Sequence, residues 1–387
     1  MNICVVLVDR ANYGRLKPVM AELRTRPGVR MQVVCAGTML LDRFGKAKQV
    51  VEADGFPIDE EVYLEIDGSL PATMTKSIGL GIIEFSSVFR KLDPDFVLLI
   101  GDRYEALAAA IAAVYQNLCL IHLQGGEVTG SIDEATRHAI TKLAHYHFPA
   151  TRRSGRYIVR MGERPETVFP LGCPSADVVA AASGDVPAER IAAAGVGAEI
   201  DFGKPYLLTL FHPVTTEFAA AEDQMNELLA AVKETGMQIV LLWPNIDAGA
   251  DSVSGAIRRF REFNRDVPLH AFKNFEPEDY VPLLRQAACC VGNSSSFVRE
   301  ASFLGTPVVL VGSRQDGREW SGAVKRVEPI REAIAEAIAA QLAHGRYPPS
   351  GLYGKPGVSA RIADKIATLR PYGQKRLAYG KEKATGV

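Results

Sequence analysis

The sequence lacks the features that mark membrane, secreted and dinucleotide-binding proteins. No stretch approaches the roughly 20 apolar residues of a membrane span. The opening run MNICVVLVDR has no basic leader before its short apolar segment and no cleavage site after it. A GxGxxG fingerprint is also missing. We therefore expect a cytoplasmic protein without a membrane partner, whose first segment is a strand.

Cysteine is scarce and its spacing suits no metal. There are six cysteines, with no CxxC pair and no Cys/His spacing typical of zinc. Most of them lie in apolar, strand-like runs: Cys4, Cys35, Cys119, Cys173, Cys289 and Cys290. We interpret them as buried thiols in a reducing compartment, and we expect neither a metal nor a cofactor.

Charge of one sign is not in excess. The chain has 44 Lys and Arg against 45 Asp and Glu, a net charge of -1. No global basic field therefore points to nucleic acid or to an anionic membrane, and any bound anion must be met by local groups. A content of 47% hydrophobic and 23% charged residues is typical of an ordinary globular protein.

Length and periodicity predict an α/β protein with two domains. A chain of 387 residues is too long for one ordinary core. Apolar runs alternate with helical patterns throughout, which indicates parallel sheets covered on both faces. The expected strands are Ile3–Asp9, Met31–Gly37, Phe96–Gly101, Leu118–Leu123, Tyr146–Pro149, Val168–Leu171, Tyr206–Leu210, Ile239–Trp243, Leu269–Phe272, Cys289–Val291 and Val308–Val311.

We place the first Rossmann-like domain at residues 1–170 and expect the helix over 358–370 to complete it. The second spans 171–350. Two doubly wound domains of similar size face each other across a cleft, and each offers the carboxyl ends of its strands to that cleft. The ligand site is therefore expected to be shared.

The densest polar segment of the chain is QGGEVTGSIDEATRHAITKLAHYH, residues 124–147. It follows the apolar run 118–123 and leads into a helix that is predicted to begin near Asp133. Two glycines, two acids and an Arg-His pair thus fall where a buried strand ends. Gly-Gly as a plain turn and Asp133 as a plain helix cap are the alternatives for single residues.

Other polar groups follow other strands in the same way. Arg10 lies before a helix that is predicted to open near Arg15, where guanidinium and helix N–H groups suit an anion. An Asp-Arg pair, 102–103, leaves another strand and could be a structural ion pair. In the second domain the corresponding positions hold His212, Asn245, Ser294, Ser295 and Arg314. Several anion-binding groups on two facing domains fit a nucleotide diphosphate better than a small carboxylate.

Eight of these segments, in order, resemble the hydrolysing UDP-N-acetylglucosamine 2-epimerases of bacterial sialic-acid pathways and the epimerase domain of the animal bifunctional enzyme. They are RANYGRL, GDRYEALA, GGEVTGSIDEATRHAITKLAHYH, LGCPSADV, HPVTTE, PNIDAG, GNSSSFVRE and GTPVVLVGSRQDGRE. The resemblance covers almost the whole chain and implies the two-domain glycosyltransferase-B fold.

The resemblance also implies a reaction and roles for residues. UDP leaves C1 as the C2 proton is removed, and water adds to the 2-acetamidoglycal to yield free N-acetylmannosamine. The diphosphate would be held by Arg10, His212, Ser294 and Ser295, the ribose by Glu300, and the phosphate or sugar side by Arg314. Proton transfer would involve Asp102, Asp133 and position 124, with Arg103 and Asn245 close by. We also place His138 among the substrate-binding residues.

The chain departs from the family at position 124. Members often have Glu there, in EGGE, whereas this chain has Gln124, which can orient a substrate but cannot exchange a proton. Either Asp102 and Asp133 suffice, or Glu127 takes the role, or the protein is a slow or modified enzyme. Asn12 and Gly14 likewise stand where members commonly have Asp and Ser.

The interpretation from the sequence is thus a hydrolysing 2-epimerase of UDP-GlcNAc or a close 2-acetamido analogue, assembled as a homodimer or homotetramer. Three alternatives stay open. They are a 2-epimerase of a UDP-2,4-diacetamido-6-deoxy sugar as in legionaminic-acid pathways, a non-hydrolysing epimerase, and a catalytically weak binder of sugar nucleotides. An inverting glycosyltransferase on the same fold is a further possibility, to be favoured only if UDP release needs an acceptor.

Overall fold

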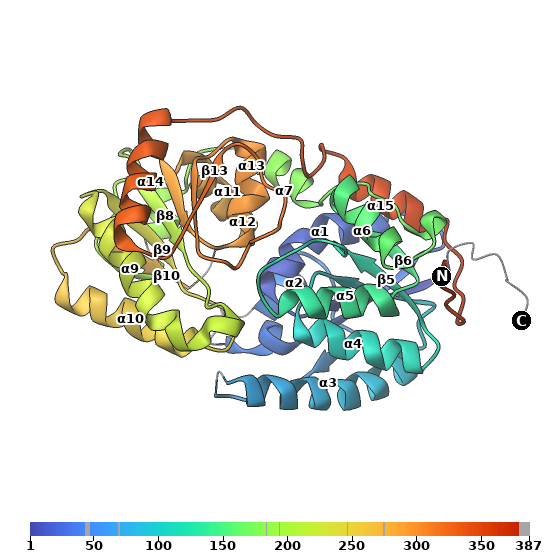
Figure 1. The fold of residues 1–387 in the computed structure, drawn as a ribbon. Coiled ribbons are helices and arrows are strands. Elements are labelled where there is room, and N and C mark those ends of the chain that lie inside the picture. Colours follow the sequence, from blue (N-terminus) through green and yellow to red (C-terminus); the bar gives the residue numbers. More distant parts are fainter. Residues whose placement is uncertain are drawn as a thin grey trace, which may run out of the picture.

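Two parallel sheets organise the molecule. The computed structural model describes residues 1–42, 47–68, 70–182, 184–192, 194–245, 247–273 and 275–378. Within these residues the strands form one sheet of six and one of seven, in separate domains that lie side by side (Figure 1). The predicted architecture of two doubly wound Rossmann-like domains is confirmed.

The first sheet has the order β3-β2-β1-β4-β5-β6, and its strands pair in parallel. Its strands are β1 (Asn2–Leu7), β2 (Arg30–Ala36), β3 (Glu60–Val62), β4 (Phe96–Ile100), β5 (Cys119–Leu123) and β6 (Tyr146–Phe148). The helices between them are α1 (Arg10–Arg24), α2 (Ala47–Ala53), α3 (Pro71–Leu92), α4 (Tyr104–Tyr115), α5 (Asp133–Leu143) and α6 (Arg152–Arg160). Alternate residues of β1 and β4 enter two separate apolar cores, so helices cover both faces of the sheet.

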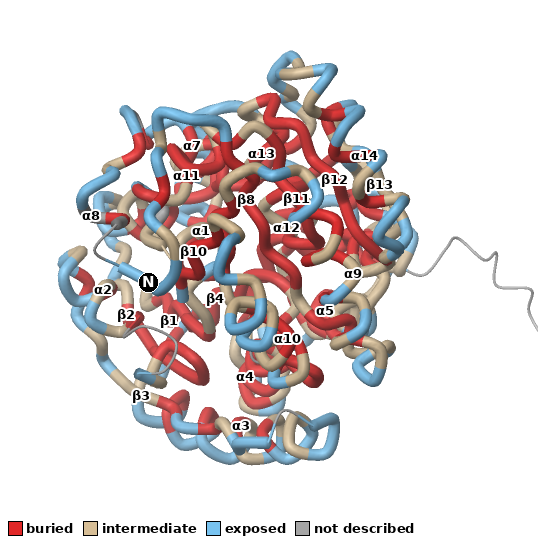
Figure 2. The backbone as a smooth tube through the Cα atoms, turned by 90° about the vertical axis from the view of Figure 1, so that its left-hand side faces the viewer, coloured by how far each residue is buried: buried red, intermediate tan, exposed pale blue. Residues whose placement is uncertain are grey.

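The second sheet has the order β13-β12-β11-β8-β9-β10-β7, parallel except where β7 meets β10. Its strands are β7 (Val196–Gly197), β8 (Tyr206–Leu210), β9 (Gln238–Leu242), β10 (Leu269–Phe272), β11 (Cys289–Gly292), β12 (Val308–Val311) and β13 (Val324–Val327). The helices are α7 (Ser175–Ala181), α8 (Ala188–Ala192), α9 (Ala221–Glu234), α10 (Ala250–Phe263), α11 (Pro277–Gln286), α12 (Ser295–Val298), α13 (Glu300–Leu304) and α14 (Arg331–His344). Figure 2 shows the buried residues concentrated along the strands of both sheets.

The last helix, α15 (Val358–Ala367), returns to the first domain and lies beside α1 (Figure 1). Val358, Ile362 and Ile366 are fully buried in the core that also contains β1. The chain beyond α15 continues over the same domain, where the Tyr372 hydroxyl donates to the His145 carbonyl at 3.2 Å. We therefore propose that residues 1–170 and this helix form one folding unit, with 171–350 forming the other.

Several expectations about elements were wrong. Within the described chain, Val168 forms only a single bridge to His147, because Pro170 and Gly172, at φ 115°, break the expected strand over 168–171. Helix α1 begins at Arg10, well before Arg15, because the Asp9 side chain caps it by accepting from Asn12 N at 2.6 Å. The short edge strands β3, β7 and β13 were not anticipated.

Two expectations from composition can be compared with the structure. All six cysteines, each within the described ranges, are buried free thiols, as predicted. None of the helices in the described part of the chain is long and apolar enough to cross a membrane.

Candidate functional site

A pocket lies between the two domains, at the carboxyl ends of strands from both sheets. The first domain contributes Arg15, Gly101, Asp102, Gln124, Thr129 and Asp133 to its lining. The second contributes Ser295, Arg299, Arg314, Gln315 and Arg318. The shared cleft expected from the sequence is therefore present. Both acids and Arg15 lie on the first domain's wall, and three arginines lie on the second domain's wall.

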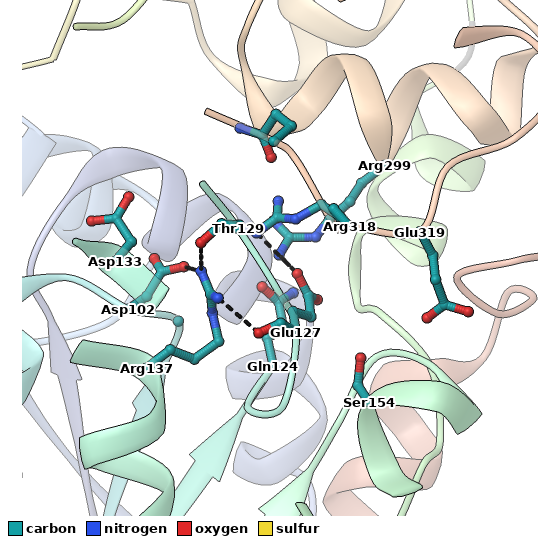
Figure 3. Close-up of polar contacts among 12 residues, drawn as sticks. Asp102, Gln124, Glu127, Thr129, Asp133, Arg137, Ser154, Arg299, Arg318 and Glu319 are labelled. Carbon is teal, nitrogen blue, oxygen red and sulfur yellow. Dashed lines mark hydrogen bonds and ion pairs between the residues drawn. The ribbon is translucent and has the colours of Figure 1, made fainter. Parts of the chain in front are cut away.

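Asp102 follows β4 and is held by a buried arginine. Arg137, one helical turn after Asp133 on α5, forms an ion pair with Asp102 and donates to Thr129 Oγ1 at 3.1 Å and to the Glu127 carbonyl at 2.9 Å (Figure 3). Burial alone would raise the pKa of Asp102, but Arg137 and the second domain's Arg318 hold this pKa well below its ordinary value. Asp102 is therefore ionised at neutral pH.

Asp133 is the first residue of α5, as predicted. Its Oδ2 accepts from Ser131 Oγ at 2.9 Å and lies 3.6 Å from Nη2 of Arg314 in the other domain. Burial, and then the negative charge of Asp102, raise the pKa of Asp133 to about 6. Two neighbouring carboxyls thus have pKa values shifted in opposite directions, the pattern by which acid–base pairs divide their roles.

The glycines after β5 are required by close packing. A Cβ on Gly125 would lie 2.7 Å from Thr141 Oγ1, and one on Gly126, at φ 73°, would lie 2.4 Å from the Ser154 carbonyl oxygen. The backbone of Gln124 just before them is itself left-handed, with φ 63°. Gly-Gly is therefore more than a turn, because it lets the loop pass against α5 and α6 and places Gln124 in the pocket.

Glu127 joins the two domains. Its Oε2 lies 2.5 Å from Nη2 of Arg299 and 3.1 Å from Nη2 of Arg318, and all three side chains are at most 4% exposed (Figure 3). Burial would raise the pKa of Glu127, but the two guanidinium groups lower it. Its carboxylate is thus committed to an ion cluster between the domains. The proton-transfer role considered for Glu127 stays a prediction.

Arg103 lies in a second cluster between the domains. It contacts Glu105 at 2.8 Å, Asp247 of the second domain at 2.5 Å and Asp9 at 3.7 Å. Asn245 Nδ2 also donates to Asp247, so Arg103 and Asn245 contact the same carboxylate. Their expected place beside the proton-transfer residues stays a prediction.

His212 is neutral and fixed by backbone contacts. Its backbone N donates to Asn293 Oδ1 at 2.8 Å, and its Nδ1 accepts from Asn245 N at 3.1 Å. Burial lowers the pKa of His212 to about 3, helped by the positive charge of Arg314. With Nδ1 accepting, the neutral ring has its proton on Nε2, so it can act as a hydrogen-bond donor but not as a titrating acid near neutral pH.

The serine loop after β11 supplies part of the second wall. Ser294 caps α12, accepting from Ser296 N at 3.3 Å, and Ser295 lines the pocket. Gly292 must be glycine, because at φ 143° a Cβ would lie 2.0 Å from the Leu210 carbonyl oxygen. The Glu300 carboxylate accepts from Ser175 Oγ at 2.6 Å, and Arg314 Nη1 donates to the Asn293 carbonyl at 3.5 Å.

Five predicted substrate-binding residues are not among the described residues that line the pocket: Arg10, Asn245, Ser294, Glu300 and His138. Arg10 forms an ion pair with Glu276, which bridges the domains beside α1. His138 lies on α5 with its Nε2 2.9 Å from Glu134 Oε1. Their roles in binding stay predictions.

Most of the arginines at this site were not predicted from the sequence. Arg15, Arg137, Arg299 and Arg318 were not assigned to the site, although each lines the pocket or orders its acids. One signal was available, since Arg137 follows Asp133 by four residues and so shares its helix face. The described residues contain no group of three or more His, Cys, Asp or Glu side chains that could hold a metal ion.

Comparison with known proteins points in one direction. The model of the family described as UDP-N-acetylglucosamine 2-epimerase matches residues 21–367. The hydrolysing UDP-N,N'-diacetylbacillosamine 2-epimerase of Legionella pneumophila is 33% identical over 96% of this chain and 97% of that protein. The UDP-N-acetylglucosamine 2-epimerase of Neisseria meningitidis is 28% identical over 89% of this chain and 88% of that protein.

Solved structures agree with the fold. The Neisseria meningitidis enzyme bound to UDP-GlcNAc has a TM-score of 0.77 at 18% identity, over 95% of this chain and 100% of that chain. The Methanocaldococcus jannaschii UDP-GlcNAc 2-epimerase in complex with UDP-GlcNAc and UDP has a TM-score of 0.78 at 17% identity, over 95% and 99% of the two chains.

Proposed function

Because this chain belongs to the UDP-N-acetylglucosamine 2-epimerase family, we propose that it is a hydrolysing 2-epimerase that releases UDP and a free 2-acetamido sugar. The observation that carries the proposal is the pair Asp102 and Asp133, with oppositely shifted pKa values, facing the arginines of the other domain. Such a pair suits proton transfer at a carbon next to a bond whose leaving group is anionic and faces arginines.

The first step is elimination. The C1–O bond to UDP breaks and the C2–H bond breaks, leaving a C1=C2 double bond in the 2-acetamidoglycal. No carbonyl adjoins C2 to acidify its proton, so departure of the diphosphate must lead. Arg299, Arg314 and Arg318 line the pocket and stabilise the charge that develops on the leaving oxygen.

Asp133 accepts the C2 proton. Its pKa of about 6 leaves it mostly ionised at neutral pH yet still basic enough to take a proton. Asp102 stays ionised, orders Arg137 and keeps that pKa high. In the second step water adds its oxygen to C1, and a proton returns to C2 on the opposite face, which inverts that carbon.

A specific observation supports a second candidate substrate. The Legionella pneumophila relative is named for UDP-N,N'-diacetylbacillosamine and shares more of this chain than the Neisseria relative, 33% against 28%. The two sugars differ at C4 and C6, away from the reacting carbons. We propose UDP-GlcNAc and UDP-N,N'-diacetylbacillosamine as the two substrates to compare.

The decisive experiment is product NMR in deuterated water with each sugar nucleotide. Phosphorus spectra are expected to show free UDP, and proton spectra a free 2-epimer labelled at C2. UDP release without label at C2 would overturn the elimination mechanism. A UDP-linked 2-epimer with little free UDP would identify a non-hydrolysing enzyme, and release that depends on an acceptor would identify a glycosyltransferase. Full turnover by the native chain would exclude the alternative of a catalytically weak binder of sugar nucleotides.

We also propose that the enzyme works in the cytoplasm, where sugar nucleotides are used, as a homodimer or homotetramer. Light scattering of the purified chain tests the assembly, and a monomeric mass at micromolar concentration would contradict it.

A further inference from the structure

Only one of the two polar atoms of the Gln124 side-chain amide has a hydrogen-bond partner among the described residues. Its Nε2 donates to Cys173 Sγ at 3.1 Å, while its Oε1 has no hydrogen-bond partner among the described residues. The residue is 1% exposed and lines the pocket beside Asp102 and Asp133. A buried acceptor without a partner is costly, which is expected where a ligand supplies the missing donor.

A comparison within the chain shows why location matters. Gln32 on β2 is also buried, donates its Nε2 to the Leu92 carbonyl at 2.8 Å, and has an Oε1 without a partner in the described structure. It lies on the sheet, whereas Gln124 lines the pocket, on a left-handed backbone at φ 63°. That backbone is sparsely populated for a residue with a Cβ and tends to be kept at functional positions.

We propose that Gln124 Oε1 accepts a hydrogen bond from the N–H of the acetamido group at C2 of the bound sugar, with Cys173 as the positioning residue that holds the amide. This deepens the proposed function and rests on it. The acids that act at C2 share the pocket with Gln124, and the acetamido N–H is the neutral donor borne by that same carbon. Cys173 suits its part, because burial raises the pKa of its thiol and keeps it uncharged.

Neutrality at position 124 has a consequence for the acid pair. A carboxylate there would be a third negative charge beside Asp102 and Asp133, and like charge raises the pKa of a carboxyl. Gln124 therefore accepts from the substrate while leaving the pKa of Asp133 near 6.

The test compares Gln124→Met with the wild type, since methionine keeps an unbranched side chain of similar length without the amide. KM for the UDP-2-acetamido sugar is expected to rise about 3- to 10-fold with kcat nearly unchanged, the worth of one hydrogen bond made equally in ground and transition states. The inhibition constants of UDP and of UDP-2-deoxyglucose, which has no donor at C2, are expected to stay within about twofold. An unchanged KM, or an equal loss for all three ligands, would overturn the proposal.

Four further variants separate the effect of the position of Gln124 from effects of packing. Gln32→Met removes a buried amide of the same kind and is expected to leave KM unchanged. Cys173→Ala removes the acceptor of the Gln124 Nε2 hydrogen bond and is expected to raise KM. Cys173→Ser keeps an acceptor and is expected to have the wild-type KM. Gln124→Glu is expected to move the acid limb of the pH profile upward. Failure of Cys173→Ser to restore KM, or an unmoved acid limb, would count against the assignment.

Failure of this inference differs from failure of the proposed function. If the wild type releases UDP with label at C2 but Gln124→Met binds substrate as well as the wild type does, only the inference falls. If the wild type releases no UDP, the proposed function falls. Calorimetric binding of UDP-GlcNAc to the wild type and to Gln124→Met then still decides the role of Gln124.

Discussion

Oδ2 of Asp133 lies 3.6 Å from Nη2 of Arg314, so the first residue of α5 faces a guanidinium group of the other domain. Arg314 lowers the pKa of Asp133, while burial and Asp102 raise it, and the balance is a pKa of about 6. The protonation of Asp133 is therefore linked to how closely the two domains approach. In a site divided between domains, the carboxyl can in this way become fully ionised only in the arrangement that also surrounds the substrate.

The first prediction concerns pH. Because Asp133 must be ionised to accept a proton, kcat/KM is expected to fall about tenfold per pH unit below about pH 6. Asp133→Asn is expected to lower kcat by about 10²- to 10⁴-fold and to abolish that limb. A pH–rate profile from pH 4.5 to 8.5 checks both, and an acid limb that survives in the variant would contradict the assignment.

The same shift predicts the effect on stability. The folded pKa of Asp133 is raised above its ordinary value of 3.8, so the folded state binds the proton more tightly. Stability from this group is present at low pH and is lost as pH rises from about 4 through 6. Asp133→Asn is therefore expected to match or exceed the wild type in Tm at pH 8, with the difference shrinking toward pH 4.

The second prediction concerns Asp102. Asp102, in the loop after β4, forms an ion pair with Arg137, which is 0% exposed. Asp102→Asn removes this ion pair. Removing one member of a buried ion pair costs about 3–5 kcal/mol, and the remaining contacts of Arg137 favour the lower end of this range. Loss of the negative charge also lowers the pKa of Asp133. Thermal unfolding and an NMR titration of the Asp133 carboxyl check the two effects, and an unchanged Asp133 titration would contradict the coupling.

Much of this fold could be predicted from the sequence because its strands are buried on both faces. Such strands read as continuous apolar runs, as in FVLLI of β4 and YLLTL of β8, and the polar groups that follow them mark the cleft. The edge strands β3, β7 and β13 have sequences such as EEV and VKRV, which lack that pattern. They form because their backbone groups pair with free N–H and C=O groups of a neighbouring strand. The local sequence does not indicate such pairing.

The partners of the charged residues were harder to predict. Asp133 and Asp102 were placed by strand ends, but the pairing of Glu127 with Arg299 and Arg318 joins positions about 170 to 190 residues apart in different domains. Nothing in the spacing of these residues says which guanidinium meets which carboxylate. Helix boundaries failed for a local reason, since Asp9 can cap a helix start that apolar periodicity places later.

The third prediction contrasts two ion pairs between the domains. Glu127→Gln removes the carboxylate from a cluster in which every side chain is at most 4% exposed, and is expected to cost about 3–5 kcal/mol. Glu319→Gln weakens a contact to Arg153 at 3.4 Å in which the two side chains are 31% and 20% exposed, so it is expected to cost about 1 kcal/mol or less. Thermal unfolding at matched pH ranks the two variants. Equal losses would show that the buried cluster is not what holds the domains together.

The fourth prediction tests whether the close approach of the domains matters for activity. Gly130 N donates to the Arg314 carbonyl at 3.1 Å, and a Cβ on Gly130 would lie 2.0 Å from the Ser313 carbonyl oxygen. Gly130→Ala therefore forces the two loops apart at the mouth of the pocket. Displacement of reacting groups by about 1 Å can cost roughly 10²-fold, so kcat/KM is expected to fall by at least about tenfold.

The matched control for Gly130→Ala is Gly322→Ala, because an added Cβ at Gly322 meets nothing within 4 Å in the described structure. That variant is expected to keep wild-type kinetics. Small-angle scattering with UDP is expected to show a larger radius for Gly130→Ala than for the wild type or for Gly322→Ala. Wild-type kcat/KM in Gly130→Ala would mean that the domains can turn over substrate without this contact.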